Sequence, residues 1–131
     1  MDIELYKKLR QSGFIREVGF EAAEMENGYA RCELVLQEKH FNPIGSVHGG
    51  VIFTMADTVG GAAAVSRGRS VTTVSGDIHF LRPAMNSKKL IGESQEVKTG
   101  KNMCVYNVMI SDETGRQIAM ATMTYYYIQE K

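Results

Sequence analysis

The alternation of apolar and polar positions divides the first third of the chain into a helix and a hairpin. Residues 2–11 carry their apolar side chains on one side of a short amphipathic helix. Two strands are predicted at 18–25 and 29–36, separated by Glu26-Asn27-Gly28. Asn-Gly between two such runs is the strongest short-range signal for a β-hairpin. In the second strand, alternation points one set of side chains inward: Ala30, Cys32, Leu34 and Leu36.

The longest apolar run of the chain predicts a long helix at 49–66, after a loop at 37–47. Its sequence is GGVIFTMADTVGGAAAVS, and four glycines, two threonines, a serine and an aspartate favour a buried helix over a membrane span. Arg67-Gly68-Arg69 ends the helix, because glycine accepts a left-handed conformation and arginine suits the negative end of the helix dipole. A helix that is apolar on all sides must be covered on all sides.

Four more strands are predicted at 72–82, 90–98, 102–112 and 117–128. Alternation in the first of them separates Val74, Gly76, Ile78 and Phe80 from a second face with Thr73, Ser75, Asp77 and His79. The last two strands are apolar on nearly both faces, so their sheet needs a partner besides the helix. The pattern therefore predicts one α+β domain over 1–131, with a curved antiparallel sheet wrapped around a long central helix. Because the sheet covers only one side of that helix, a loop, the N-terminal helix or a second chain must cover the rest, and we infer a homo-oligomer.

Composition and charge narrow the possible partners. Lysine plus arginine and aspartate plus glutamate number 15 each, and this zero net charge argues against nucleic-acid binding. Cys32 and Cys104 are predicted to be small buried side chains in a reducing compartment. The first residues form no signal peptide, so we expect a cytoplasmic protein that is not bound to a membrane. His40, His48 and His79 lack a metal-ligand spacing, and no nucleotide motif is present, so neither a metal nor a cofactor is expected.

Asp57 is the sole ionisable side chain in the apolar helix and the only acidic residue between Glu38 and Asp77. Burying a carboxylate without a partner costs roughly several kcal/mol of folding free energy, even after the protein relaxes around it. Asp57 is therefore predicted to be paired, protonated or catalytic, and each of these points to a site.

His48 and Gly49 stand at the start of the same helix, where the first N–H groups have no internal acceptor and the dipole is positive. Glycines there let a substrate approach the backbone, which suits a carbonyl oxygen that gains negative charge. Asp57 follows His48 by about half a revolution and roughly 13 Å along the axis, so the two side chains point apart within one chain. They would meet if two chains pack their helices antiparallel, and Gly60 and Gly61, on the Asp57 face, would let another backbone come close. The geometry predicts a site shared across a dimer.

The motif residues and the Asp57 spacing resemble the hotdog-fold acyl-CoA thioesterases of the PaaI-like family. The resemblance covers about residues 15–128, and two strings carry it together with Asp57: Asn42-Pro43-Ile44-Gly45-Ser46-Val47-His48-Gly49-Gly50 and Phe80-Leu81-Arg82-Pro83-Ala84. It implies a hotdog fold and hydrolysis of an acyl-CoA substrate to a carboxylic acid and CoA. It also implies a homodimer, commonly assembled into a homotetramer, that uses no cofactor.

The resemblance also implies roles for single residues. Asp57 would be the general base or the nucleophile, and Asn42, together with His48 and the Gly49 amide, would bind and polarise the thioester carbonyl. Thr73 would help to place the water, at a position where the family often has serine. The CoA moiety would reach basic groups at the rim of the subunit interface, for which the candidates are Arg82, Lys101, Arg67 and Arg69.

Each of these residues also has a structural interpretation. Asp57 could satisfy a buried polar group, His48 could cap the helix, Asn42 could shape the turn at Pro43, and Thr73 is an ordinary strand residue. Most methionines are expected in the core, with a minority lining an acyl pocket: Met55, Met103, Met109, Met120 and Met123. For the whole protein the alternatives are a non-catalytic acyl-CoA sensor, a hotdog enoyl-CoA hydratase or dehydratase, and a purely structural oligomer.

Overall fold

The structure is a computed structural model that describes residues 4, 13–21 and 23–128. In this part the chain forms two α-helices, one 3-10 helix and six strands. In order they are α2 (Gly13–Val18), β1 (Glu24–Glu26), β2 (Tyr29–Val35), η1 (Glu38–His40), α3 (Gly49–Val65), β3 (Val71–Phe80), β4 (Lys89–Thr99), β5 (Met103–Asp112) and β6 (Gln117–Tyr127). The helix predicted at 2–11 lies outside the described residues, apart from residue 4.

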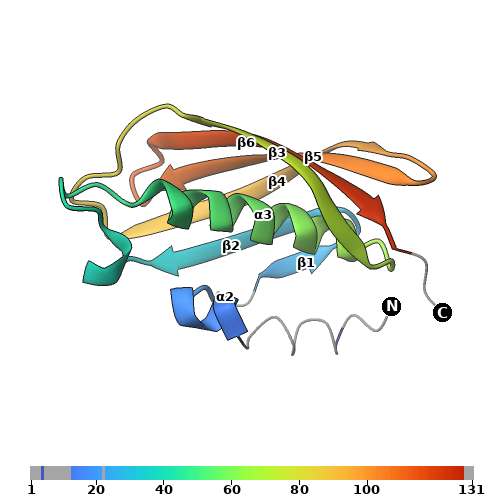
Figure 1. Ribbon diagram of the computed structural model, residues 1–131, viewed down its shortest axis with the longest axis horizontal. Helices are drawn as coiled ribbons and strands as arrows, with labels where there is room; N and C mark the ends of the chain where they lie inside the picture. Colours follow the sequence, from blue (N-terminus) through green and yellow to red (C-terminus); the bar gives the residue numbers. More distant parts are fainter. Residues whose placement is uncertain (1–3, 5–12, 22, 129–131) are drawn as a thin grey trace.

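The six described strands form one antiparallel sheet in the order β1-β2-β4-β5-β6-β3. The long helix α3 lies along one face of this sheet, and α2 lies beside the edge formed by β1 and β2 (Figure 1). The side chains between α3 and the sheet form the core, where Met55, Val59, Leu90 and Ile110 are fully buried. This arrangement confirms the predicted α+β hotdog fold.

The signals for the hairpin and for the long helix were both correct. Asn27 and Gly28 have φ of 46° and 87°, the left-handed conformations that a two-residue hairpin turn needs. Gly68 follows α3 with φ of 99°, as expected of a glycine that ends a helix. Among the described residues, no helix is long and apolar enough to cross a membrane.

The strand predicted at 18–25 is wrong for most of its length, because only Glu24–Glu26 pairs with β2. Gly19 has φ of 102° and donates its N–H to the Ile15 carbonyl, which closes the short helix α2 instead of beginning a strand. Phe20 and Ala23 are nevertheless buried. Their alternation therefore reflects packing of an irregular segment against the core.

The faces predicted for β3 are wrong at its beginning, because the strand contains a β-bulge. Thr73 pairs with Tyr125, whereas Ser75 pairs with Thr124, so Val74 is an extra residue without a partner on β6. An extra residue exchanges the two faces of a strand from that point onward. Thr73 therefore shares the helix-facing side with Gly76, Ile78 and Phe80 and not with Asp77 and His79. Val74 itself is half exposed.

One edge of the molecule carries unusual exposed apolar surface. In the described part of the chain, β3 pairs only with β6, and Val74 and Phe80 on it are 52% and 54% exposed. Beside this edge, α3 leaves a stripe of partly exposed residues, in which Asp57 lies about one turn after the first pair and one turn before the last member: Phe53, Thr54, Asp57 and Gly61. The sheet and the other described segments thus leave one side of α3 partly exposed.

The methionines divide between the core and the outer face of the sheet. Met55 and Met123 are fully buried, as predicted. Met103, Met109 and Met120 lie on the face of β5 and β6 that points away from α3, so the prediction that they belong to the core is wrong. Cys32 and Cys104 are buried, as predicted.

Candidate active site

The Asp57 carboxylate lies between α3 and the edge of the sheet, where two hydroxyl groups bind the same oxygen. Thr73 Oγ1 donates to Asp57 Oδ1 at 2.8 Å, and the Tyr125 hydroxyl is 3.2 Å from that oxygen. The Tyr125 hydroxyl is also 3.1 Å from the Asp57 backbone carbonyl. Asp57 is partly exposed rather than buried, and among the described residues no hydrogen bond reaches Oδ2. The carboxylate is thus paired through one oxygen and presents the other.

Thr73 reaches Asp57 because of the bulge in β3. With regular alternation, Thr73 would share the outer face with Asp77, on the far side of the sheet from α3. The extra residue Val74 turns the Thr73 side chain toward the helix instead. The contact between Thr73 and Asp57 therefore depends on a local irregularity that the apolar pattern does not show.

Tyr125 is a further residue of the site, one that was not predicted from the sequence. It lies on β6, its side chain is 1% exposed, and its ring passes over Gly60 of α3. The available signal was the need of a buried tyrosine hydroxyl for a hydrogen-bond partner, since the facing helix offers one carboxylate. Gly60 was expected to admit the backbone of a second chain, but within this chain it makes room for the Tyr125 side chain.

At the start of α3, His48 caps the helix through its side chain. His48 Nδ1 accepts a hydrogen bond from the Gly50 N–H at 2.8 Å, and the His48 carbonyl accepts from Val51 and Ile52. His48 therefore caps the helix through Nδ1, as its structural interpretation predicted. Gly49 is the first residue of the helix, so its N–H has no acceptor within α3, and no other acceptor is found among the described residues.

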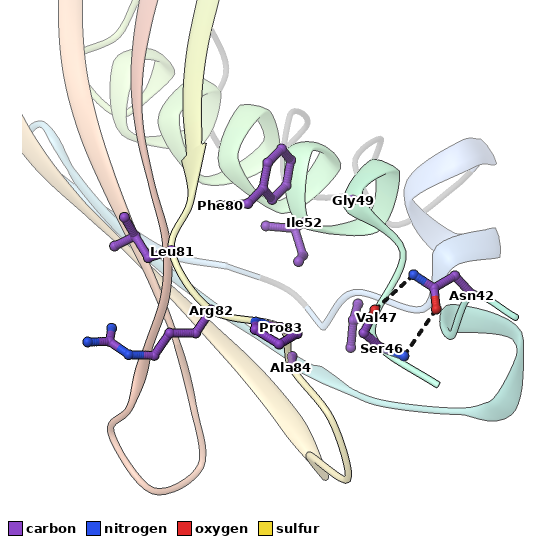
Figure 2. A pocket seen from close by; sticks show the side chains of 10 residues that line it. All are labelled: Asn42, Ser46, Val47, Gly49, Ile52, Phe80, Leu81, Arg82, Pro83 and Ala84. Carbon is purple, nitrogen blue, oxygen red and sulfur yellow. Dashed lines mark hydrogen bonds between the residues drawn. The ribbon is translucent and has the colours of Figure 1, made fainter. Parts of the chain in front are cut away.

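A cavity of about 350 Å³ opens beside Gly49 and contains the side chain of Asn42 in its wall (Figure 2). Asn42 Oδ1 accepts from the Ile44 and Ser46 N–H groups at 3.1 Å, and Nδ2 donates to Ser46 Oγ at 2.8 Å. Asn42 thus shapes the turn at Pro43, as its structural interpretation predicted. Nδ2 carries two protons, and its second proton has no acceptor among the described residues.

Within one chain, the acid and the helix start have different surroundings. His48 lines a separate cavity of about 570 Å³ with residues of α2 and η1, among them Val18 and His40. Asp57 lines neither cavity and faces β3 and β6. The predicted divergence of His48 and Asp57 around the helix therefore agrees with their contacts.

Comparison with known proteins places this geometry in a family. Residues 44–119, which contain Gly49, Asp57 and Thr73, match the thioesterase superfamily. The chain belongs to this family. It is thus a thioester hydrolase with a hotdog fold.

Two relatives in this family cover most of the chain. A predicted esterase of Archaeoglobus fulgidus is 32% identical over 107 residues, which are 82% of this chain and 70% of the relative. The acyl-coenzyme A thioesterase PaaI of Escherichia coli is 28% identical over 105 residues, 80% of this chain and 75% of the relative. The structure of E. coli PaaI superposes with a TM-score of 0.89 at 24% identity, covering 97% of this chain and 92% of that one. The likeness of the two structures establishes the shared fold.

A hypothetical thioesterase of Streptococcus pneumoniae, whose structure was solved with coenzyme A, resembles the chain as well. Its TM-score is 0.80 at 25% identity, over 86% of this chain and 88% of that one. Two further structures of that protein carry an aspartate-to-alanine and a threonine-to-alanine substitution. Those two positions are sixteen residues apart in their chain, the same separation as Asp57 and Thr73 here.

The four candidate CoA-binding cations of this thioesterase lie in two places. Arg82 borders the Gly49 cavity and donates from its guanidinium to the Gln117 carbonyl at 2.9 Å. The other three lie beyond the opposite end of α3, near the turn between β4 and β5: Arg67, Arg69 and Lys101.

Of the three cations near the turn between β4 and β5, Arg67 and Arg69 already make contacts within the chain. The Arg67 guanidinium is 2.6 Å from the Glu96 carboxylate, and this contact holds the pKa of Glu96 below its ordinary value. Arg69 stacks over the Tyr127 ring at 4.1 Å and donates to the Lys101 carbonyl at 3.1 Å. Among the described residues, no group of three or more His, Cys, Asp or Glu side chains could hold a metal ion.

Proposed function

We propose that this thioesterase hydrolyses acyl-CoA to a free carboxylic acid and CoA, without a cofactor, at a site shared by two chains. The observation that carries the proposal is the Asp57 carboxylate, which Thr73 holds through Oδ1 beside β3, the last strand of the sheet formed by the described residues. Both hydroxyl contacts are made to Oδ1, so Oδ2 of this partly exposed side chain is available to water or to a substrate. The names of two relatives support the substrate class, since one is an acyl-coenzyme A thioesterase and the other was solved with coenzyme A.

The proposed reaction places the thioester carbonyl oxygen at the Gly49 N–H and in reach of the Asn42 amide. Asp57 Oδ2 takes a proton from water, whose oxygen attacks the carbonyl carbon while negative charge moves onto the carbonyl oxygen. The C–S bond then breaks, and the proton held by Asp57 passes to the departing thiolate of CoA. In the variant mechanism, Oδ2 attacks the carbon directly, the C–S bond breaks, and the CoA thiolate leaves. Water then hydrolyses the resulting anhydride to the free acid and the Asp57 carboxylate, and the proton released passes to the thiolate.

The open edge of the sheet supports the pairing of two chains. A long, exposed and apolar edge strand is a template for pairing with another strand, and most homodimers are related by a two-fold axis. Pairing through β3 would cover Val74 and Phe80 and would place two α3 helices antiparallel beside each other. Gly49 of one chain would then approach Asp57 of the partner subunit. The half-exposed outer face of β5 and β6 would remain to join two dimers in a homotetramer.

The substitution Asp57→Asn tests the role of the acid. Asparagine keeps an oxygen for the Thr73 and Tyr125 hydroxyls and removes the charge and the basicity. We expect kcat to fall by about 10²-fold or more, measured as free thiol released from phenylacetyl-, hydroxybenzoyl-, short- and long-chain acyl-CoA. Asp77→Asn, at an exposed carboxylate on the outer face of β3, is the matched control and should keep its activity.

A folded Asp57→Asn variant with wild-type turnover would show that the proposed mechanism is wrong. Tight binding of acyl-CoA by the wild type without thiol release would favour the sensor. Loss of the conjugated chromophore of an enoyl-CoA would favour the hydratase or dehydratase. The thiol assay and the chromophore assay therefore separate the alternative functions.

Heterodimers test whether the site is shared. One chain would carry Asp57→Asn and the other Gly49→Pro, which removes the backbone N–H. If each site takes one group from each chain, the two defects fall in the same site and the other site is intact, so about half of the wild-type activity returns. If both groups act within one chain, each site has one defect and the heterodimer is as inactive as its parents.

A further inference from the structure

The Tyr125 hydroxyl bridges the main chain and the side chain of Asp57, at 3.1 Å from the carbonyl and 3.2 Å from Oδ1. We infer that Tyr125 is a positioning residue that fixes which oxygen of Asp57 reacts, and that residue 60 is a glycine to admit its hydroxyl. The inference rests on the proposed role of Asp57 and adds two residues to it.

The position of Tyr125 makes it a rigid support. Its side chain is buried, on a strand between β5 and β3, and its ring packs against α3. A buried ring has little freedom to move, so its hydroxyl keeps a constant place relative to the helix. Because that hydroxyl contacts both the carbonyl and Oδ1 of one residue, it restricts rotation of the Asp57 carboxylate. Thr73 binds Oδ1 from β3, and Oδ2 is left to face the substrate.

Gly60 supplies the second, independent observation. A Cβ at this position would lie 2.4 Å from the Tyr125 hydroxyl oxygen and 3.2 Å from two ring carbons. Glycine forms helices less well than alanine, and the backbone at Gly60 does not have a positive φ that would demand glycine. At Gly61, one position later, a Cβ would be 3.9 Å from the same ring, an ordinary contact. The missing side chain at Gly60 therefore matches the path of the tyrosine hydroxyl.

The substitution Tyr125→Phe removes the hydroxyl and keeps the ring. Because a small misplacement of a catalytic group slows the reaction more than it weakens binding, we expect kcat to fall by about 10- to 100-fold with KM unchanged. Tyr106→Phe is the matched control: Tyr106 is also fully buried and its hydroxyl also binds a carboxylate, that of Glu96 at 3.2 Å. It should keep the wild-type kcat.

The substitution Gly60→Ala tests the same contact from the helix. The new methyl group must displace the Tyr125 hydroxyl, so kcat should fall about as far as in Tyr125→Phe, again roughly 10- to 100-fold. In the double variant the hydroxyl is already absent, so the two losses should not multiply, and kcat should match that of Tyr125→Phe alone. Multiplying losses would show that Gly60 acts independently of Tyr125 and would overturn its part of the inference.

The set of variants distinguishes this inference from the proposed function. If Asp57→Asn is inactive and Tyr125→Phe keeps the wild-type kcat, the positioning role is wrong and the proposed function stands. If Tyr106→Phe loses kcat as much as Tyr125→Phe, the tyrosine hydroxyls act only on the fold and the inference is overturned. If Asp57→Asn is fully active, both proposals fail. If Gly60→Ala does not fold, Tyr125→Phe with its control decides the outcome.

Discussion

The Gly49 N–H can be removed with little disturbance of the helix, which makes Gly49→Pro a sharp test of the oxyanion site. Proline is well tolerated at the first position of a helix, where the N–H has no internal acceptor. The preceding residue, His48, has φ of −59° and ψ of 134°, a conformation that proline favours in its neighbour. The substitution should therefore remove one donor from the site and leave α3 in place.

The expected loss follows from the value of one oxyanion donor. Removing such a donor costs about 3 kcal/mol in the transition state, or two to three decades in kcat. The donor acts on charge that develops during the reaction, so KM should change little. Thermal unfolding should report a melting temperature close to that of the wild type.

Gly49→Ala is the matched control for this experiment. It adds the same Cβ, which would lie 3.4 Å from the partly exposed Phe80 ring, and it keeps the N–H. Thiol release from acyl-CoA under saturating substrate compares the two variants. Equal kcat values for Gly49→Pro and Gly49→Ala would refute the role of the N–H. A rise in KM without a fall in kcat would show that the proline ring merely excludes the substrate.

Two further substitutions test the edge strand and a buried carboxylate. If two chains pair through β3 as proposed, Val74→Lys should give monomers in light scattering and abolish activity. Val97→Lys, at a similarly exposed bulge on the interior strand β4, should do neither. A dimeric Val74→Lys variant would disprove pairing through β3. Asp112 accepts hydrogen bonds from the Thr114 hydroxyl and from the Thr114 and Arg116 N–H groups, and these contacts lower its pKa below the ordinary 3.8. The stabilisation is therefore present above pH 3.8 and lost as the pH falls through the lower folded-state pKa. Asp112→Asn should cost about 2 kcal/mol of unfolding free energy at pH 7 in denaturant titrations, and this difference should shrink toward zero in strong acid; a difference that does not depend on pH would contradict the argument.

Much of the fold was predictable because its main signals are local. Asn27 and Gly28 mark a hairpin by themselves, and the apolar run ending before Gly68 is too long for a strand. The error at 18–25 has a local cause as well. Phe20 and Ala23 are buried in an irregular segment, and burial without strand pairing gives the same alternation as a strand.

The site was only partly predictable, because two of its contacts depend on tertiary structure. Asp57 and Gly49 stand out in the sequence, since one is a lone acid in an apolar run and the other begins a helix. Thr73 was assigned to the wrong face, because the bulge at Val74 becomes apparent only when β3 is paired with β6. A buried tyrosine hydroxyl needs a partner, but the sequence alone does not show that for Tyr125 this partner is Asp57, because the contact depends on how α3 packs on β6.

The extra residue at position 74 makes the site depend on the exact number of residues in β3. Because side chains alternate along a strand, the number of residues between Thr73 and the later part of β3 decides whether the Thr73 side chain points toward α3 or away from it. A deletion of one residue after Thr73 would restore a regular strand and improve its local geometry, yet it would turn either the hydroxyl or the rest of the strand to the wrong side. Alignments of relatives should therefore treat a one-residue gap in this strand as a change of chemistry and not as a harmless variation in length.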